Sequence, residues 1–126
     1  MILTAFVSLP FSSFQKDSKN VTSYIRTVDR TYVEKTIKNG GAILIDARTG
    51  FQFNAGHIPG AINIPYNNNR LLEFYNKHGL ETKPLIVYCS DPNCPAAEIL
   101  SRELANIGYK NIALYAGGWK DWIKHR

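Results

Sequence analysis

Short apolar runs alternate along the chain with stretches whose apolar residues recur every three or four positions. The short runs predict strands at residues 22–28, 42–46, 61–65, 85–88 and 111–115. The periodic stretches predict helices that begin at residue 29 or 31 and at residues 70, 96 and 119. Because strands and helices alternate, we expect one α/β domain over residues 22–126, with a central parallel sheet flanked by helices on both faces.

The first residues of the chain do not fit this alternation. Met1 to Phe14 is apolar but is interrupted by Thr4, Ser8 and Pro10, and it is too short to span a bilayer. It also lacks the basic start of a signal peptide. We therefore expect residues 1–21 to form an N-terminal arm, with a residual targeting segment as the alternative. The first case predicts a cytoplasmic protein, and the second an exported or periplasmic one.

Composition narrows the range of partners. The chain has 126 residues, 44% of them hydrophobic, and a net charge of +5, which fits a globular domain that weakly favours anionic partners. No nucleic-acid motif accompanies the charge. Two cysteines five positions apart are too few for a disulfide scaffold. They are also too few for a zinc site unless His57 joins them, so we expect no metal and no other cofactor.

Cys89 is the candidate reactive residue. It follows the apolar run at 85–88, and a polar loop leads from it to Pro95, a residue suited to the first turn of a helix. Cys89 should therefore lie at the carboxyl end of a buried strand, where parallel sheets build their sites. A helix N-terminus and converging backbone N–H groups would stabilise its thiolate. A buried cysteine that only fills space is the alternative at this position.

Several motifs, in order and at matching spacing, resemble the single-domain rhodaneses. They cover about residues 22–126, and only their combination is specific. The matching segments are Leu44-Ile-Asp46-Ala-Arg48, Phe53-x-x-Gly56-His57-Ile-Pro-Gly-Ala61-x-Asn-Ile-Pro65, Ile86-Val-Tyr-Cys89, Gly108-Tyr109-x-Asn111 and Leu114-x-x-Gly117-Gly118-Trp119-x-x-Trp122.

The resemblance implies a sulfurtransferase that works through a cysteine persulfide. Cys89 would take the outer sulfur of a small anionic donor such as thiosulfate and pass it to cyanide, to a thiol or to a partner protein. The backbone N–H groups of the loop would hold the persulfide. That loop comprises Ser90, Asp91, Pro92, Asn93 and Cys94.

Three further residues match family positions around the site. We interpret Asp46 and Arg48 as an ionic and hydrogen-bonding support beneath the loop. We interpret His57 as a turn histidine whose hydrogen bonds are satisfied.

The loop itself departs from the family pattern. The family commonly has Cys-x-x-Gly-x-Arg, whereas this chain has Cys89-Ser-Asp-Pro-Asn-Cys94. The arginine that would clamp an anionic donor is absent, Asp91 adds a negative charge, and Pro92 removes an N–H group. Thiosulfate is therefore expected to be a poor donor.

Cys94 replaces the arginine, and its spacing suggests a second role. We hypothesise that it resolves Cys89 by closing an intramolecular disulfide, and a small residue packed under the loop is the equal alternative. A thiol redox protein and a non-catalytic persulfide carrier remain competing functions. A cysteine phosphatase is disfavoured because Pro95 stands where its Cys-x5-Arg loop needs arginine, and a thioredoxin-like protein is disfavoured by the Cys-x4-Cys spacing.

Overall fold

The structure is a computed structural model that describes residues 22–66 and 69–125. The expectations for Met1 to Phe14 and for the whole arm at 1–21 lie outside these residues. The described strands are β1 (Ile25–Val28), β2 (Ile43–Asp46), β3 (Ile62–Asn63), β4 (Leu85–Tyr88) and β5 (Ile112–Tyr115). The described helices are α2 (Arg30–Lys38), α3 (Gly50–Ala55), α4 (Arg70–His78), α5 (Ala96–Ile107) and α6 (Gly118–Lys124).

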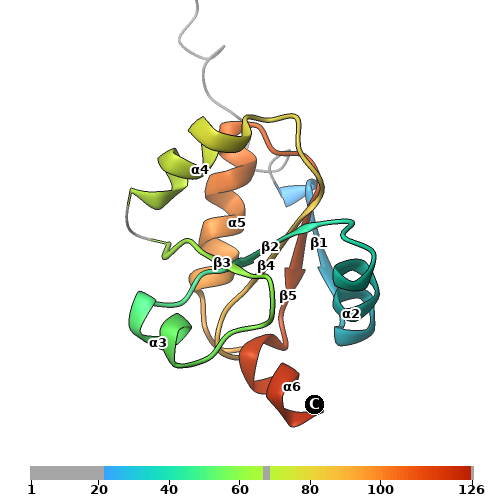
Figure 1. Ribbon diagram of the computed structural model, residues 1–126. Helices are drawn as coiled ribbons and strands as arrows, with labels where there is room; N and C mark the ends of the chain where they lie inside the picture. The colour runs from blue at the N-terminus through green and yellow to red at the C-terminus, as the bar shows by residue number, and fades with distance from the viewer. Residues whose placement is uncertain (1–21, 67–68, 126) are drawn as a thin grey trace, which may run out of the picture.

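The five strands form one parallel sheet in the order β1-β5-β4-β2-β3 (Figure 1). The central strand β4 pairs with β2 on one side, where Asp46 lies opposite Tyr88, and with β5 on the other. All four residues of β4 are buried, as a central strand covered on both faces requires. The predicted fold class is confirmed.

Alternate residues of the strands face two separate cores. Ile45 and Val87 pack with α4 and α5 on one face, together with Phe74 and Leu100. The other face carries Leu44, Ile86 and Tyr88, which pack with Val33 of α2, Phe53 of α3 and the tryptophans of α6. This period of two is the reason why the sheet needs helices on both faces.

The sheet changes its winding direction between β2 and β4. The chain leaves β2 through α3, whose Phe53 packs on one face, and leaves β4 through α5, which packs on the other. The carboxyl ends of these two adjacent strands, at Asp46 and Tyr88, therefore flank a topological switch point. Cys89 follows β4 at this point.

Some predicted boundaries were wrong. β1 begins at Ile25 and not at residue 22, and β3 is only two residues long. The helix at 50–55 was not predicted, although Thr49 and Gln52 form a capping box at its start. Of the two starts considered for α2, the structure uses Asp29, whose carboxylate accepts the N–H of Tyr32 at 2.9 Å.

Candidate functional site

Cys89 and Cys94 form a disulfide within the loop between β4 and α5. Their Cα atoms are 6.2 Å apart, inside the range that a disulfide spans. Cys89 is only 4% exposed, whereas Cys94 is partly exposed. The two cysteines are therefore close enough to bond, as their spacing suggested, and the loop adopts the disulfide-bonded conformation.

Asp91 organises the backbone of this loop. Its carboxylate accepts the N–H of Asn93 at 2.8 Å, and its carbonyl accepts the N–H of Cys94 at 3.1 Å. The N–H groups of Asn93 and Cys94, which were expected to hold a persulfide, therefore donate to Asp91 instead, and Pro92 has no N–H group to donate.

The start of α6 fixes the other side of the loop. The N–H of Trp119 donates to the carbonyl of Cys89 at 2.9 Å, and the N–H of Lys120 donates to the carbonyl of Ser90 at 2.8 Å. Gly118 makes this approach possible, because a Cβ atom there would lie 2.5 Å from the Cys89 carbonyl oxygen. The α6 backbone and the loop are therefore joined directly.

A buried ion pair lies at the carboxyl end of the neighbouring strand. The Arg48 guanidinium donates to Asp46 at 2.7 Å and to the carbonyl of Gly56 at 2.6 Å, and its centre lies 5.0 Å from the Trp119 ring. Burial works against the charge of Arg48, but the hydrogen bond and charge of Asp46 outweigh it and raise the pKa of Arg48. The pair thus connects β2, the turn after α3, and α6.

Tyr88, which directly precedes Cys89, joins this network. Its hydroxyl accepts the N–H of Ile58 at 3.0 Å. Burial of the ring, together with the charge and hydrogen bond of Asp46, raises the pKa of Tyr88 far above its ordinary value. The phenol therefore stays neutral and anchors the 56–61 turn to the strand that carries Cys89.

His57 is occupied by contacts with α3. Its Nδ1 atom lies 2.8 Å from the carbonyl of Phe53, and its ring stacks on the Phe53 ring with centroids 3.7 Å apart. One ring nitrogen and one face of the His57 ring are therefore engaged by Phe53, and the role of His57 at the site stays a prediction.

Two hollows adjoin the loop. A cavity of about 50 Å³ lies at the disulfide, and Asp91 and Glu98 are among the residues that line it. A wider groove of about 270 Å³ lies beside it, between Pro92 and the lysines of α6, Lys120 and Lys124. The groove is thus lined by two lysines and by Asp121, whereas the charged residues that line the cavity are Asp91 and Glu98, of which Glu98 is paired with Arg102.

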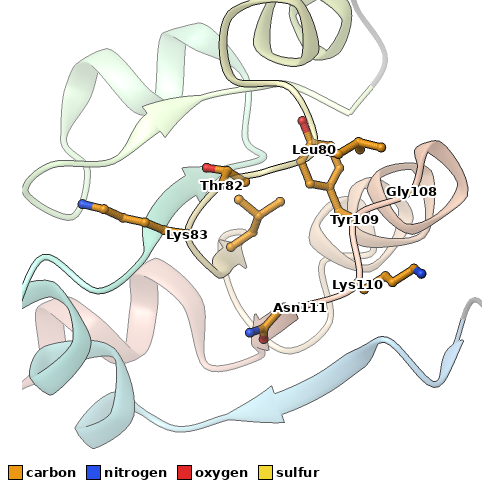
Figure 2. Close-up of a pocket in the computed structure, with 8 residues that line it drawn as sticks. Leu80, Thr82, Lys83, Gly108, Tyr109, Lys110 and Asn111 are labelled. Atoms are coloured by element: carbon orange, nitrogen blue, oxygen red, sulfur yellow. The ribbon is translucent and has the colours of Figure 1, made fainter.

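A third cavity lies away from Cys89, near the amino ends of β4 and β5. It measures about 190 Å³, and in Figure 2 Lys83 and Lys110 extend away from its centre. Tyr109 at its wall donates its hydroxyl to the carbonyl of Gly79 at 2.5 Å. Neither Cys89 nor Cys94 lines this cavity. The loop between β4 and α5, which carries both cysteines, is therefore the candidate site.

The sequence matches the Rhodanese-like domain family over residues 29–125. The chain belongs to this family. Its relatives include the thiosulfate:glutathione sulfurtransferase of Saccharomyces cerevisiae, which is 29% identical over 123 residues that cover 90% of this chain and 86% of that protein.

Solved structures of similar sequence share this fold. The BH2092 protein from Bacillus halodurans is 30% identical, with a TM-score of 0.70 over 79% of this chain and 72% of that one. The human single-domain sulfurtransferase TSTD1 is 27% identical, with a TM-score of 0.62 over 79% of this chain and 96% of that one. Two of these three similar proteins, the yeast and the human one, are sulfurtransferases.

Two further observations concern the described part of the rhodanese-like domain. Within residues 22–66 and 69–125, no three His, Cys, Asp or Glu side chains are grouped so that they could hold a metal ion. In the same residues, no helix has the length and apolar character needed to cross a membrane.

Sequence reasoning missed how closely α6 approaches the loop. Gly117-Gly118 entered the sequence analysis only as part of a matching segment, although a glycine pair at a helix start is also a signal for close backbone contact. The link from Tyr88 to Ile58 had no sequence signal, because the two residues are 30 positions apart.

Proposed function

We propose that this rhodanese-like domain is a sulfurtransferase that carries sulfane sulfur as a persulfide on Cys89. The observation that carries this proposal is the position of Cys89 at the switch point of the sheet, directly after the central strand and before α5. The donor is thiosulfate or another sulfur compound, and the acceptor is a thiol or cyanide. The sulfurtransferase homologues support the same class of reaction.

The reaction begins from the reduced pair, since a disulfide has no nucleophilic thiolate. The N-terminus of the twelve-residue helix α5 favours the Cys89 thiolate through its partial positive charge. With thiosulfate, the thiolate attacks the outer sulfur, the sulfur–sulfur bond of the donor breaks, and sulfite leaves with the electron pair. The acceptor then attacks the outer sulfur of the persulfide and restores the Cys89 thiolate.

The charges at the loop bear on the choice of donor. The residues that line the cavity at the sulfurs include Asp91, whose negative charge disfavours a dianion. Glu98 also lines the cavity, but its carboxylate is paired with Arg102 at 3.2 Å. Lys120 and Lys124 line the adjoining groove together with Asp121, so its side chains carry a net positive charge that attracts the anionic part of a larger donor or acceptor. We therefore infer that small thiosulfate is a weak donor compared with one that reaches the groove.

The disulfide favours a second candidate function, a thiol redox protein or persulfide carrier. Such a protein would exchange electrons or sulfur with a partner protein without turning over small substrates. In this function the oxidised pair is a working state, whereas for the transferase it is a form that must first be reduced.

An assay of thiocyanate formation from thiosulfate and cyanide separates the two candidates. Reduced protein should turn over repeatedly while an external thiol keeps the cysteine pair reduced, and oxidised protein should be inactive until it is reduced. Cys89→Ser provides the control for uncatalysed transfer. Absence of turnover by the reduced protein, with sulfur loading only from a protein persulfide, would favour the carrier.

A further inference from the structure

We propose that Cys94 is a resolving thiol that discharges the Cys89 persulfide as hydrosulfide. The domain would thereby act as a sulfide-releasing enzyme that consumes external thiols, in addition to transferring sulfur. This inference rests on the proposed persulfide chemistry. The observation behind it is the Cys89–Cys94 disulfide at a position where the family loop commonly carries arginine.

The loop geometry allows the second sulfur to reach the first. The two Sγ atoms are bonded while the backbone keeps the turn in which the N–H of Cys94 bonds the carbonyl of Asp91. The carbonyls of Cys89 and Ser90 are also held by α6 at the same time. Closing the disulfide is therefore compatible with the native packing of the loop on both sides.

The surroundings disfavour storage of a persulfide anion. Asn93 and Cys94 direct their N–H groups to Asp91, and Pro92 contributes none. The cavity at the sulfurs has room for a group of a few atoms at about 50 Å³, but the acidic residue Asp91 is among those that line it. An outer sulfur held there gains few donors and meets a negative charge, so a nearby thiol is placed to remove it.

The discharge step is balanced between the two cysteines and the outer sulfur. The Cys94 thiolate attacks Sγ of Cys89, and the bond from that Sγ to the outer sulfur breaks. The electron pair leaves with the outer sulfur, which takes up a proton and departs as hydrosulfide. The outer sulfur is reduced, the two cysteines are oxidised to the disulfide, and no other reactant is consumed.

A low-molecular-weight thiol then restores the reduced pair. Of the two sulfurs, that of Cys94 belongs to the more exposed residue, whereas Cys89 is 4% exposed. The external thiolate therefore attacks Cys94, and Cys89 leaves as the thiolate that the next cycle needs. A second thiol releases the mixed disulfide from Cys94, so one cycle oxidises two thiols to their disulfide. With thiosulfate as donor the products are sulfite, hydrosulfide and that disulfide.

A single-turnover experiment without external thiol tests this step. The reduced full chain, freed of reductant under anaerobic conditions, is mixed with excess thiosulfate, and sulfite and hydrosulfide are measured separately. Wild type should release one equivalent of each per chain and end with two hydrogens fewer. Cys94→Ser and Cys94→Ala should release sulfite but no hydrosulfide and retain one additional sulfur atom. Cys89→Ser should release neither.

Measuring sulfite and hydrosulfide separately distinguishes failure of the resolving role from failure of the proposed sulfurtransferase function. Sulfite with no hydrosulfide from wild type, and a stable additional sulfur, would overturn the resolving role while leaving the sulfurtransferase proposal intact. Equal hydrosulfide release from wild type and both Cys94 variants would also overturn it. No sulfite from wild type or from either Cys94 variant would overturn the proposed function, and the resolving role with it.

Discussion

Gly118 and Cys89 lie backbone against backbone, at a separation that leaves no room for a side chain between them. A Cβ atom on Gly118 would come within 2.5 Å of the Cys89 carbonyl oxygen and 3.1 Å of its carbonyl carbon. Gly118 also has a φ of +66°, a conformation that disfavours any residue with a Cβ atom. The absence of a side chain at Gly118 thus lets the first turn of α6 hold the Cys89 carbonyl, through the N–H of Trp119.

Gly118→Ala should destabilise the domain and impair sulfur transfer. The left-handed backbone alone costs about 1–2 kcal/mol, and the clash with the loop adds to that cost. Gly40→Ala is a matched control, because Gly40 has a φ of +64° and a Cβ atom added there would meet nothing within 4 Å. Urea denaturation and a transfer assay should show a larger stability loss for Gly118→Ala, and reduced activity in that variant only. Equal effects in the two variants would contradict the contact.

The ion pair between Asp46 and Arg48 should be important for stability because both side chains are buried. Asp46→Asn leaves the guanidinium without its carboxylate, and loss of one partner of a buried pair costs about 3–5 kcal/mol. The control is Arg102→Ala, which removes the exposed pair with Glu98 on α5 and should change the free energy of unfolding by less than about 1 kcal/mol. Similar losses in the two variants would argue against the buried pair as a support of the site.

Alkaline pH should weaken the fold through its buried phenols. Burial raises the pKa of Tyr88 and of Tyr115 above the ordinary value of 10.0, and the carboxylates of Asp46 and Asp121 raise them further. The neutral phenols therefore stabilise the fold fully below pH 10, and this contribution falls at higher pH by up to about 1.4 kcal/mol per pH unit for each group. The free energy of unfolding, measured by urea denaturation at a series of alkaline pH values, should decrease. A constant or rising value would contradict the prediction.

Cys94→Arg should improve the binding of thiosulfate at the loop. An arginine would add a charge-assisted contact to the dianion, worth about 1.5–3 kcal/mol at best if well placed, and would remove the thiol that discharges the persulfide. We expect a lower KM for thiosulfate with cyanide as acceptor. Cys94→Ser is the control, since it also lacks the thiol but adds no charge. Equal KM values for the two variants would place the donor outside the loop.

The sequence predicted the architecture because the signals for it are local. The apolar run of β4 and the helical period after Pro95 place Cys89 at a strand tip, and the structure confirms that position. The short helix α3 was missed because its six residues are too few to show a helical period. Its capping box was still readable, since Thr49 and Gln52 have the required spacing.

Features that depend on how a loop bends or on tertiary packing could not be predicted in the same way. Spacing left open whether Cys94 pairs with Cys89 or only packs beneath the loop, because cysteines five positions apart meet only if the turn between them bends suitably. Asp91 supplies that turn through its bonds to Asn93 and Cys94. The α6 contacts likewise depend on tertiary packing, which brings Gly118 to the loop from 29 positions away.

The persulfide on Cys89 is the central claim, and intact-protein mass spectrometry tests it most directly. Reduced Cys94→Ser, in which no intramolecular discharge is possible, is incubated with excess thiosulfate beside the Cys89→Ser variant. The account predicts a gain of one sulfur atom by the protein that retains Cys89 and no gain by the protein that lacks it. No gain by either protein, or an equal gain by both, would contradict a sulfurtransferase mechanism through Cys89.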